Sequence, residues 1–217
     1  MSTQPPSVAP ELTPTVHVVD DDPAMRSSLR WLIESVGLPV ATYGSAEQFL
    51  DEYPPGGPGC LVLDIRMPGM SGLDLQHDLV HRGLGLPVLI ITGYAEVPVA
   101  LRAMKAGAFD FIEKPFSEQT LLDRIRAALA HDDVTRRQRA MRDQVIARLR
   151  LLTQRERDVL HRVVAGKSNK VIAAELALSM KTVEVHRARL MDKLKAQSLA
   201  DLIRFALLAG ENEVPSL

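Results

Sequence analysis

The sequence has little that would stabilise it covalently or place it in a membrane. A single cysteine, Cys60, among 217 residues excludes an internal disulfide framework, which fits a reducing compartment, and we expect a cytoplasmic protein. Cys60 opens an apolar run, so we interpret it as a small buried side chain. The longest apolar runs, such as residues 87–91, fall far short of the roughly 18 residues that span a bilayer. The first 15 residues lack the charged-then-apolar layout of a signal peptide, so we expect no membrane partner.

Net charge is almost absent, at −1, but the charges are unevenly distributed. Residues 1–128 hold 9 Lys/Arg and 16 Asp/Glu, whereas residues 129–217 hold 17 Lys/Arg and 11 Asp/Glu. The acidic half therefore has a net charge of −7 and the basic half one of +6. This division indicates two domains, the second with a polyanionic partner, although a solvated basic face produces the same balance.

In the first half, short apolar runs alternate with segments of helical period. Continuous Val/Ile/Leu runs are typical of strands buried on both faces of a parallel sheet. The pattern predicts five βα units and a three-layer α/β domain. The expected strands are residues 16–19, 39–43, 60–65, 87–91 and 109–112, and the expected helices are residues 23–36, 46–53, 73–82, 97–106 and 118–130.

Polar residues follow the predicted strands where ligands bind in α/β sheets, beyond the carboxyl ends of the strands. Asp20 and Asp21 follow the first strand, Asp64 the third, Thr92 the fourth and Lys114 the fifth. A strand order of 2-1-3-4-5 makes the first and third strands neighbours, so the three carboxylates should converge. Such a cluster is expected to take up protons or to hold a cation, and Mg²⁺ favours one or two carboxylates together with waters and phosphate oxygens.

These groups suit phosphoryl transfer, which depends mainly on positioning and charge neutralisation. A carboxylate such as Asp64 can act as a nucleophile toward a phosphoryl group, and Asp20 and Asp21 could hold the metal. Lys114 would offer its positive charge to a phosphoryl oxygen, and the Thr92 hydroxyl would offer a hydrogen bond.

Residues 15–130 resemble the receiver domains of two-component response regulators. The motifs occur in the family's order and spacing: Val18-Val19-Asp20-Asp21, Leu63-Asp64-Ile65-Arg66-Met67-Pro68-Gly69, Thr92-Gly93 and Lys114-Pro115. The resemblance implies phosphorylation of Asp64 and an Mg²⁺ (or Mn²⁺) ion held by Asp20, Asp21, Asp64 and the backbone carbonyl of Arg66. It also implies that Thr92 and Lys114 sense the phosphoryl group, that Lys114-Pro115 is a cis bond, and that Phe111 is the switch aromatic.

These residues allow two other interpretations. Asp22-Pro23 fits a helix N-cap followed by proline at the first helical position, so Asp22 is not counted as a metal ligand. The second is an aspartate-nucleophile phosphatase. Such enzymes have a second Asp two residues after the nucleophile, where this chain has Arg66. We therefore expect that the protein is not an enzyme and that it only loses its own phosphoryl group slowly.

The strand pattern stops near residue 129, and a charged, arginine-rich segment without Gly or Pro follows. We interpret it as a helical linker, continuing from the last receiver helix or separate from it. Its arginines fit a solvated face or a direct DNA contact. The predicted organisation is a tail (1–14), the receiver domain (15–130), the linker (131–150), a helix-turn-helix domain (151–211) and a second tail (212–217).

The basic half shows only helical patterns, over residues 154–165, 169–176, 180–194 and 198–208. Thr153 and Glu156 form a predicted capping box, and residues 177–179 form a short turn between two helices. Four motifs resemble a LuxR-type helix-turn-helix: Leu152-Thr-Gln-Arg-Glu156, Gly166-Lys-Ser-Asn-Lys170, Ile172-Ala-Ala-Glu-Leu176 and Ser179-Met-Lys-Thr-Val-Glu-Val-His-Arg187. With the receiver, the chain resembles the NarL/FixJ class and its FixJ-like branch, in which residues 180–194 would be the recognition helix.

The resemblance places one face of this helix against the duplex. The expected DNA-binding residues are Asn169, Lys170, Lys181, Thr182, Glu184, Val185, Arg187, Arg189 and Lys193. Glu184 is open to two interpretations, an acceptor for a cytosine amino group or an ordinary surface residue. Val183, Leu190 and Leu194 share a face and are expected in the core. His186 is expected to be packed or near a phosphate. The apolar helix 198–208 is expected to pack on the domain and to pair with a second copy.

The resemblance also implies the partners. A sensor histidine kinase would phosphorylate Asp64, and two receivers would then dimerise through residues 97–106 and 109–112. The dimer would bind double-stranded operator DNA at half-sites about one helical turn apart, and a contact with RNA polymerase would follow. An alternative from another class is a phosphorylation-controlled interaction module whose basic half binds a protein or RNA.

Overall fold

The computed structural model of the chain describes residues 13–54, 56–93 and 97–210. The predicted tail over residues 212–217 lies outside these ranges, as do residues 1–12 of the first tail. The chain forms two compact units, one ending at Arg136 and the other beginning at Arg137.

The first unit is built on a parallel sheet in the predicted order, β2-β1-β3-β4-β5. The strands are β1 (Thr15–Val19), β2 (Val40–Tyr43), β3 (Gly59–Asp64), β4 (Val88–Thr92) and β5 (Asp110–Glu113). Every neighbouring pair is parallel. The expected strands are confirmed, with ends that differ by one residue.

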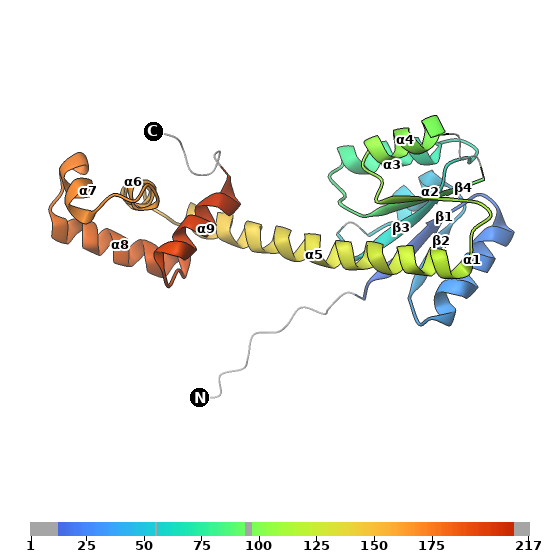
Figure 1. Cartoon of the computed structure of the whole chain (residues 1–217), viewed down its shortest axis with the longest axis horizontal. Helices are drawn as coiled ribbons and strands as arrows, with labels where there is room; N and C mark the ends of the chain where they lie inside the picture. The colour runs from blue at the N-terminus through green and yellow to red at the C-terminus, as the bar shows by residue number, and fades with distance from the viewer. Residues whose placement is uncertain (1–12, 55, 94–96, 211–217) are drawn as a thin grey trace. The chain divides into compact units, whose positions relative to one another are not determined.

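Helices cover both faces of this sheet (Figure 1). One face packs against α1 (Pro23–Ser35) and the first part of α5 (Glu118–Arg150), and the other packs against α2 (Ala46–Glu52), α3 (Gly72–His81) and α4 (Val97–Lys105). Successive residues of a strand point to opposite faces, so Cys60 and Val62 join one cluster while Leu61 and Leu63 join the other. Cys60 is buried as expected, and burial raises the pKa of its thiol to about 12.

Helix α5 runs for 33 residues and takes in the whole segment interpreted as a linker, which is therefore helical. No Gly or Pro interrupts it, so the sequence holds no strong signal for a stop after residue 130. The contacts of α5 with the rest of the first unit extend beyond residue 130. Asp132 is buried and accepts the Gly59 N–H at 2.9 Å, and Arg136 donates to the Gly56 carbonyl at 2.6 Å.

The second unit contains the end of α5 and the four expected helices, α6 (Gln154–Val164), α7 (Asn169–Leu176), α8 (Met180–Leu194) and α9 (Leu199–Ala209). Val145 and Leu149 of α5 lie in its hydrophobic core with Val159, Ile172 and Phe205. Across the described parts of the chain, no helix combines the length and the apolar character that crossing a membrane requires.

Candidate functional site

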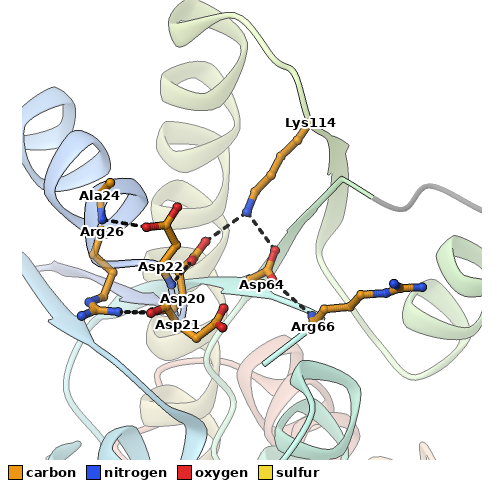
Figure 2. A network of polar contacts seen from close by, with 8 residues as sticks. All are labelled: Asp20, Asp21, Asp22, Ala24, Arg26, Asp64, Arg66 and Lys114. Atoms are coloured by element: carbon orange, nitrogen blue, oxygen red, sulfur yellow. Dashed lines mark hydrogen bonds and ion pairs between the residues drawn. The ribbon is translucent and has the colours of Figure 1, made fainter. Parts of the chain in front are cut away.

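Two buried carboxylates lie at the carboxyl ends of neighbouring strands (Figure 2). Asp20 directly follows β1 and Asp64 ends β3, and the pairing of these strands places Val19 opposite Leu63. Asp20 is 1% exposed and Asp64 6%. Burying two ionised groups side by side is costly unless a counter-charge accompanies them, so the predicted convergence creates a demand for a cation.

Lys114 meets that demand within the chain. Its ammonium lies 3.0 Å from Asp20 Oδ2 and 2.9 Å from Asp64 Oδ1, and so bridges the two carboxylates (Figure 2). Burial raises the pKa of the Asp64 carboxyl above its ordinary value, and the bond from Lys114 offsets only part of that rise. Burial by itself lowers the pKa of Lys114, but the hydrogen bonds to Asp64 and Asp20 raise it above the ordinary lysine value. The ammonium therefore stays charged between the carboxylates.

Backbone N–H groups hold the other oxygens of the pair. Asp20 Oδ1 accepts the Asp22 N–H at 2.9 Å, and Asp64 Oδ2 accepts the Arg66 N–H at 2.8 Å. The Arg66 side chain is directed away from the carboxylates in Figure 2, so this residue faces the site with its backbone. Asp21 is exposed beside Asp20. Asp22 accepts the Ala24 N–H at 2.8 Å and caps α1, as expected, with Pro23 as the first helical residue.

Thr92 and Phe111 come from the next two strands. Thr92 ends β4, is buried, and its backbone carbonyl accepts the Lys114 N–H at 2.8 Å. The Lys114-Pro115 bond is cis, as the family resemblance implied. Phe111 lies on β5 and packs partly buried against the cluster under α2, α3 and α4. The sheet therefore brings Asp20, Asp64, Thr92 and Lys114 to one edge, with Phe111 further back on its strand.

Glu47 is a residue of this site that the sequence did not reveal. It lies in the first turn of α2, and its carboxylate accepts the Met70 N–H at 3.0 Å. Hydrogen bonds lower the pKa of Glu47. The largest contribution comes from its own backbone N–H, followed by the Met70 N–H and the Ser45 side chain. The contact fixes the loop that leads from Asp64 to α3, in which Gly69 has a φ of +77° and Gly72 packs on the Asp64 backbone. The partners are 23 residues apart, so no local motif marks the contact.

The residues present fit a magnesium ion. Carboxylate and carbonyl oxygens are the hard ligands that Mg²⁺ prefers. The ammonium of Lys114 already places a positive charge between two such oxygens, those of Asp20 and Asp64. Within the residues that the structure describes, no three acidic, histidine or cysteine side chains form a ready metal cluster. A cation at this edge would thus have few protein ligands and would keep several waters, which is the usual mode of Mg²⁺ binding.

The second unit contains a helix-turn-helix formed by α7 and α8. Ser168 and Ser179 cap the two helices, and Ala177 between them adopts a left-handed φ of 54°. The Leu178 N–H donates to the Ala173 carbonyl at 2.9 Å and closes the turn. Val183, Leu190 and Leu194 are buried, so the predicted core face of α8 is confirmed. Exposed residues lie on the opposite face of α8.

Four of the expected DNA-binding residues, Lys181, Glu184, Val185 and Arg189, are exposed on that face, and Lys170 is exposed on α7. Thr182 is half-buried, and its hydroxyl lies 2.8 Å from the Ser179 hydroxyl in the cap of α8. Arg187 donates to the Asn169 side chain at 2.8 Å, which links the two helices. His186 is half-buried, and its buried Nδ1 has no hydrogen-bond partner among the residues that the structure describes.

Lys193 differs from the other expected DNA-binding residues in its surroundings. Its ammonium lies 2.6 Å from Glu156, a carboxylate that is 3% exposed, and 3.2 Å from the Leu151 carbonyl. Glu156 also completes the predicted capping box with Thr153. Lys193 therefore neutralises a buried charge of its own domain, and its contact with DNA stays a prediction. The sequence could not reveal this pair because its members are 37 residues apart.

Comparison with known families agrees with both units. Residues 16–126 match the family described as the response regulator receiver domain. Residues 150–206 match the family described as bacterial regulatory proteins, luxR family.

Relatives match along nearly the whole chain. The transcriptional regulatory protein FixJ of Azorhizobium caulinodans is 49% identical, over 93% of this chain and 95% of its own. FixJ of Rhizobium meliloti is 45% identical, over 90% and 96%. Among solved structures, the response regulator StyR is 46% identical with a TM-score of 0.80, over 89% of this chain and 98% of its own. The full-length FixJ structure from B. japonicum is 42% identical with a TM-score of 0.56, over 91% and 97%. The chain therefore belongs to the two-component response regulators of the NarL/FixJ class, transcriptional regulators that join a receiver domain to a LuxR-type DNA-binding domain.

Proposed function

We propose that this regulator is switched by phosphorylation of Asp64 by a sensor histidine kinase, and that the phosphorylated form dimerises and binds operator DNA. In the transfer, the P–N bond of a phosphohistidine breaks as a P–O bond forms to the Asp64 carboxylate. The observation that supports this most is the ammonium of Lys114, shared between Asp64 and Asp20 at 2.9 and 3.0 Å. A buried carboxylate with a preplaced cation is positioned to accept an anionic group.

Asp20, Asp21, Asp64 and the Arg66 carbonyl would hold Mg²⁺, or Mn²⁺ in its place. When bound, the ion neutralises negative charge on the phosphoryl oxygens. The chain's own groups complete the site. Lys114 exchanges one carboxylate contact for a phosphoryl oxygen, and the Thr92 hydroxyl donates a hydrogen bond to another. Phe111, half-buried on β5, then moves inward as the switch aromatic.

Any hydrolysis is slow loss of the chain's own phosphoryl group rather than turnover of a substrate. Aspartate-nucleophile phosphatases have a second Asp two residues after the nucleophile, where it acts on the leaving group. Here that position is Arg66, whose side chain is directed away from the carboxylates (Figure 2). The site therefore has a nucleophile but lacks that acid.

The receivers would dimerise through α4 and β5. Leu101 and Met104 of α4 are 54% and 44% exposed, and apolar side chains of this size favour a partner surface. On β5, Asp110 pairs with Arg124 of α5 at 3.1 Å, a surface ion pair that a second copy can exchange. Inward movement of Phe111 would change the same strand, so the phosphoryl group and the dimer face are coupled through β5.

Operator DNA would lie against the exposed face of α8. Lys181 and Arg189 would meet phosphates or bases, Val185 a thymine methyl group, and Glu184 either a cytosine amino group or solvent. Asn169, Lys170, Thr182 and Arg187 lie at the helix junction and would contact the backbone. Because chromosomal DNA lies in the bacterial cytoplasm, the protein would act there. RNA polymerase bound near the operator would then be within its reach.

Intact mass and light scattering test the switch directly. Wild type, Asp64→Asn and the control Asp51→Asn, an exposed acid of α2, are incubated with Mg²⁺ and a small phosphodonor. We expect one phosphoryl group and a shift to dimer in the wild type and in Asp51→Asn, and neither in Asp64→Asn. Phosphorylation and dimerisation of Asp64→Asn at the wild-type level would refute the proposal.

A further inference from the structure

Two histidines lie one helical turn apart on the outer side of α3. His77 and His81 are both exposed, and their Nε2 atoms are 2.8 Å apart with ring centroids 4.2 Å apart. Residues i and i+4 of a helix lie on the same face, so the backbone itself keeps the two rings together. The inward side of the same helix is formed by Leu75, Gln76 and Leu79, which are buried. The pair thus belongs to a surface that the phosphorylation pocket does not use.

We propose that His77 and His81 form a chelating site for a divalent transition metal. The site would bind Cu²⁺ most tightly and Ni²⁺ more weakly. Imidazole is the nitrogen ligand that these ions favour, and affinity at such a site rises from Ni²⁺ to Cu²⁺. The proposed metal site takes no part in phosphoryl transfer or in DNA binding.

The spacing of the two nitrogens selects the geometry. Two metal–nitrogen bonds of about 2.0–2.1 Å that meet at a right angle separate the nitrogens by about 2.9 Å, whereas a tetrahedral angle separates them by about 3.4 Å. The observed 2.8 Å is a hydrogen bond in which one ring N–H donates to the other ring nitrogen, and it holds the two nitrogens near the right-angled separation. A bound ion would take the place of the shared proton, which moves to the protonated ring's other nitrogen or to solvent. Square-planar and tetragonal sites, typical of Cu²⁺ and Ni²⁺, have neighbouring ligands at that angle, whereas tetrahedral Zn²⁺ would require the rings to move apart.

The surroundings also favour a cation. His81 is the last residue of α3, where the partial negative charge of the helix dipole is concentrated. Arg82, the next residue, forms an ion pair with Asp78 at 2.7 Å, which offsets its positive charge. Asp74, one turn before His77, adds a carboxylate to the same side of the helix and accepts the Ser71 hydroxyl. Among the residues that the structure describes, no third acidic, histidine or cysteine side chain joins the pair in a metal cluster, so water completes the shell.

Binding should be measured with Cu²⁺ and Ni²⁺ on tag-free, full-length protein at pH 8, because imidazole binds metals in its neutral form. Wild type is compared with a His77→Ala, His81→Ala double variant and with a matched control, His131→Ala, His161→Ala. The chain has 6 histidines, so both variants keep 4 of them and the same N-terminal amine. Alanine favours helix more than histidine, so the variants should fold, and phosphorylation of Asp64 checks that they do.

The wild type and the control should bind one Cu²⁺ whose electron paramagnetic resonance spectrum shows two equivalent nitrogen ligands. Affinity should fall at least about tenfold in the double variant, because the second imidazole of a chelate binds at a high effective concentration. Ni²⁺ should raise the thermal midpoint of the wild type and the control only, since a ligand of the folded state stabilises it. Unchanged copper affinity in His77→Ala, His81→Ala, or a loss confined to the control, would overturn the site.

Discussion

The cations of the two units differ in what they face. In the receiver, Lys114 lies between two buried carboxylates, and its charge is balanced before any ligand arrives. On α8, the expected recognition helix, Lys181 and Arg189 are exposed to solvent. A site for one phosphoryl group gains from preorganised, desolvated charge. A DNA-binding face instead gains from solvated charges that release the counterions of the DNA when they meet its phosphates.

Lys193 shows that this difference does not simply follow the domain boundary. It lies on the recognition helix, yet it is bound to the buried Glu156 in the same way that Lys114 is bound to Asp64. Residue type and position along the helix suggest a DNA contact, whereas the partner at 2.6 Å indicates a structural role. The distinction between paired and unpaired cations is therefore the property to test.

The largest expected effect concerns Glu156. Replacing it with alanine removes the Thr153 capping box and leaves Lys193 without its buried partner, which should lower the free energy of unfolding by about 2–3 kcal/mol. Asp192→Ala, which removes the partner of Lys195 at an exposed site, should leave it almost unchanged. Urea denaturation measures both. Equal effects of the two changes would show that burial does not distinguish these pairs.

The pair of Glu156 and Lys193 should also make the free energy of unfolding depend on pH. Burial raises the pKa of Glu156, but the hydrogen bonds from Lys193 and Thr153 outweigh burial and lower it. A lowered carboxyl pKa means that the stabilisation is present above the ordinary glutamate range and is lost as the pH falls through the lowered value. Wild type and Glu156→Ala should therefore approach each other in stability under acidic conditions.

The next effect separates the cations of α8 by their salt dependence. Lys181→Ala and Arg189→Ala should each weaken operator binding about tenfold and reduce the slope of log affinity against log salt by about one per protomer. Lys193→Ala should leave that slope unchanged, because its ammonium already neutralises Glu156. Fluorescence anisotropy over a range of salt concentrations measures all three. A reduced slope for Lys193→Ala would show that this residue also contacts DNA.

A smaller effect is expected in the receiver. Asp64→Asn removes a buried charge while Lys114 keeps Asp20, so without Mg²⁺ the free energy of unfolding should rise by about 1 kcal/mol at neutral pH. The pKa of Asp64 is raised, so the folded state takes up a proton first and the wild type gains stability as the pH falls through that raised value. The difference between the two proteins should therefore shrink on acidification. A constant difference across this range would argue against a raised pKa.

The smallest effect concerns Glu47, which positions the loop after Asp64. Glu47→Ala should slow phosphorylation from a small phosphodonor a few-fold and weaken Mg²⁺ binding, because the loop that carries Arg66 loses its contact at Met70. Glu47→Gln keeps an acceptor oxygen and should restore most of the rate. If the glutamine variant is as slow as the alanine variant, the charge rather than the hydrogen bond is what matters.

The sequence predicted the features that follow from strand ends and local motifs. Asp20, Asp64, Thr92 and Lys114 each end or follow a strand, and parallel strands bring such residues to one edge. Contacts between residues far apart in the chain were not predictable, because they depend on how the elements pack. Glu47 with Met70, Glu156 with Lys193, and Asp132 with Gly59 are of this kind.

The extent of α5 was left open for a different reason. Its sequence lacks a breaker, so helical pattern alone could not fix where the helix of the receiver ends. The buried contacts of Asp132, Val145 and Leu149 give each end of the segment a place in one of the two units.

The central claim is that the phosphoryl group on Asp64 controls DNA binding by the second unit. The most direct test is capture of genomic fragments by wild type and by Asp64→Asn, each with and without phosphodonor and Mg²⁺, followed by sequencing. We predict that phosphodonor enriches a small set of fragments with paired half-sites for the wild type only. Equal enrichment by Asp64→Asn, or by the wild type without phosphodonor, would contradict the claim.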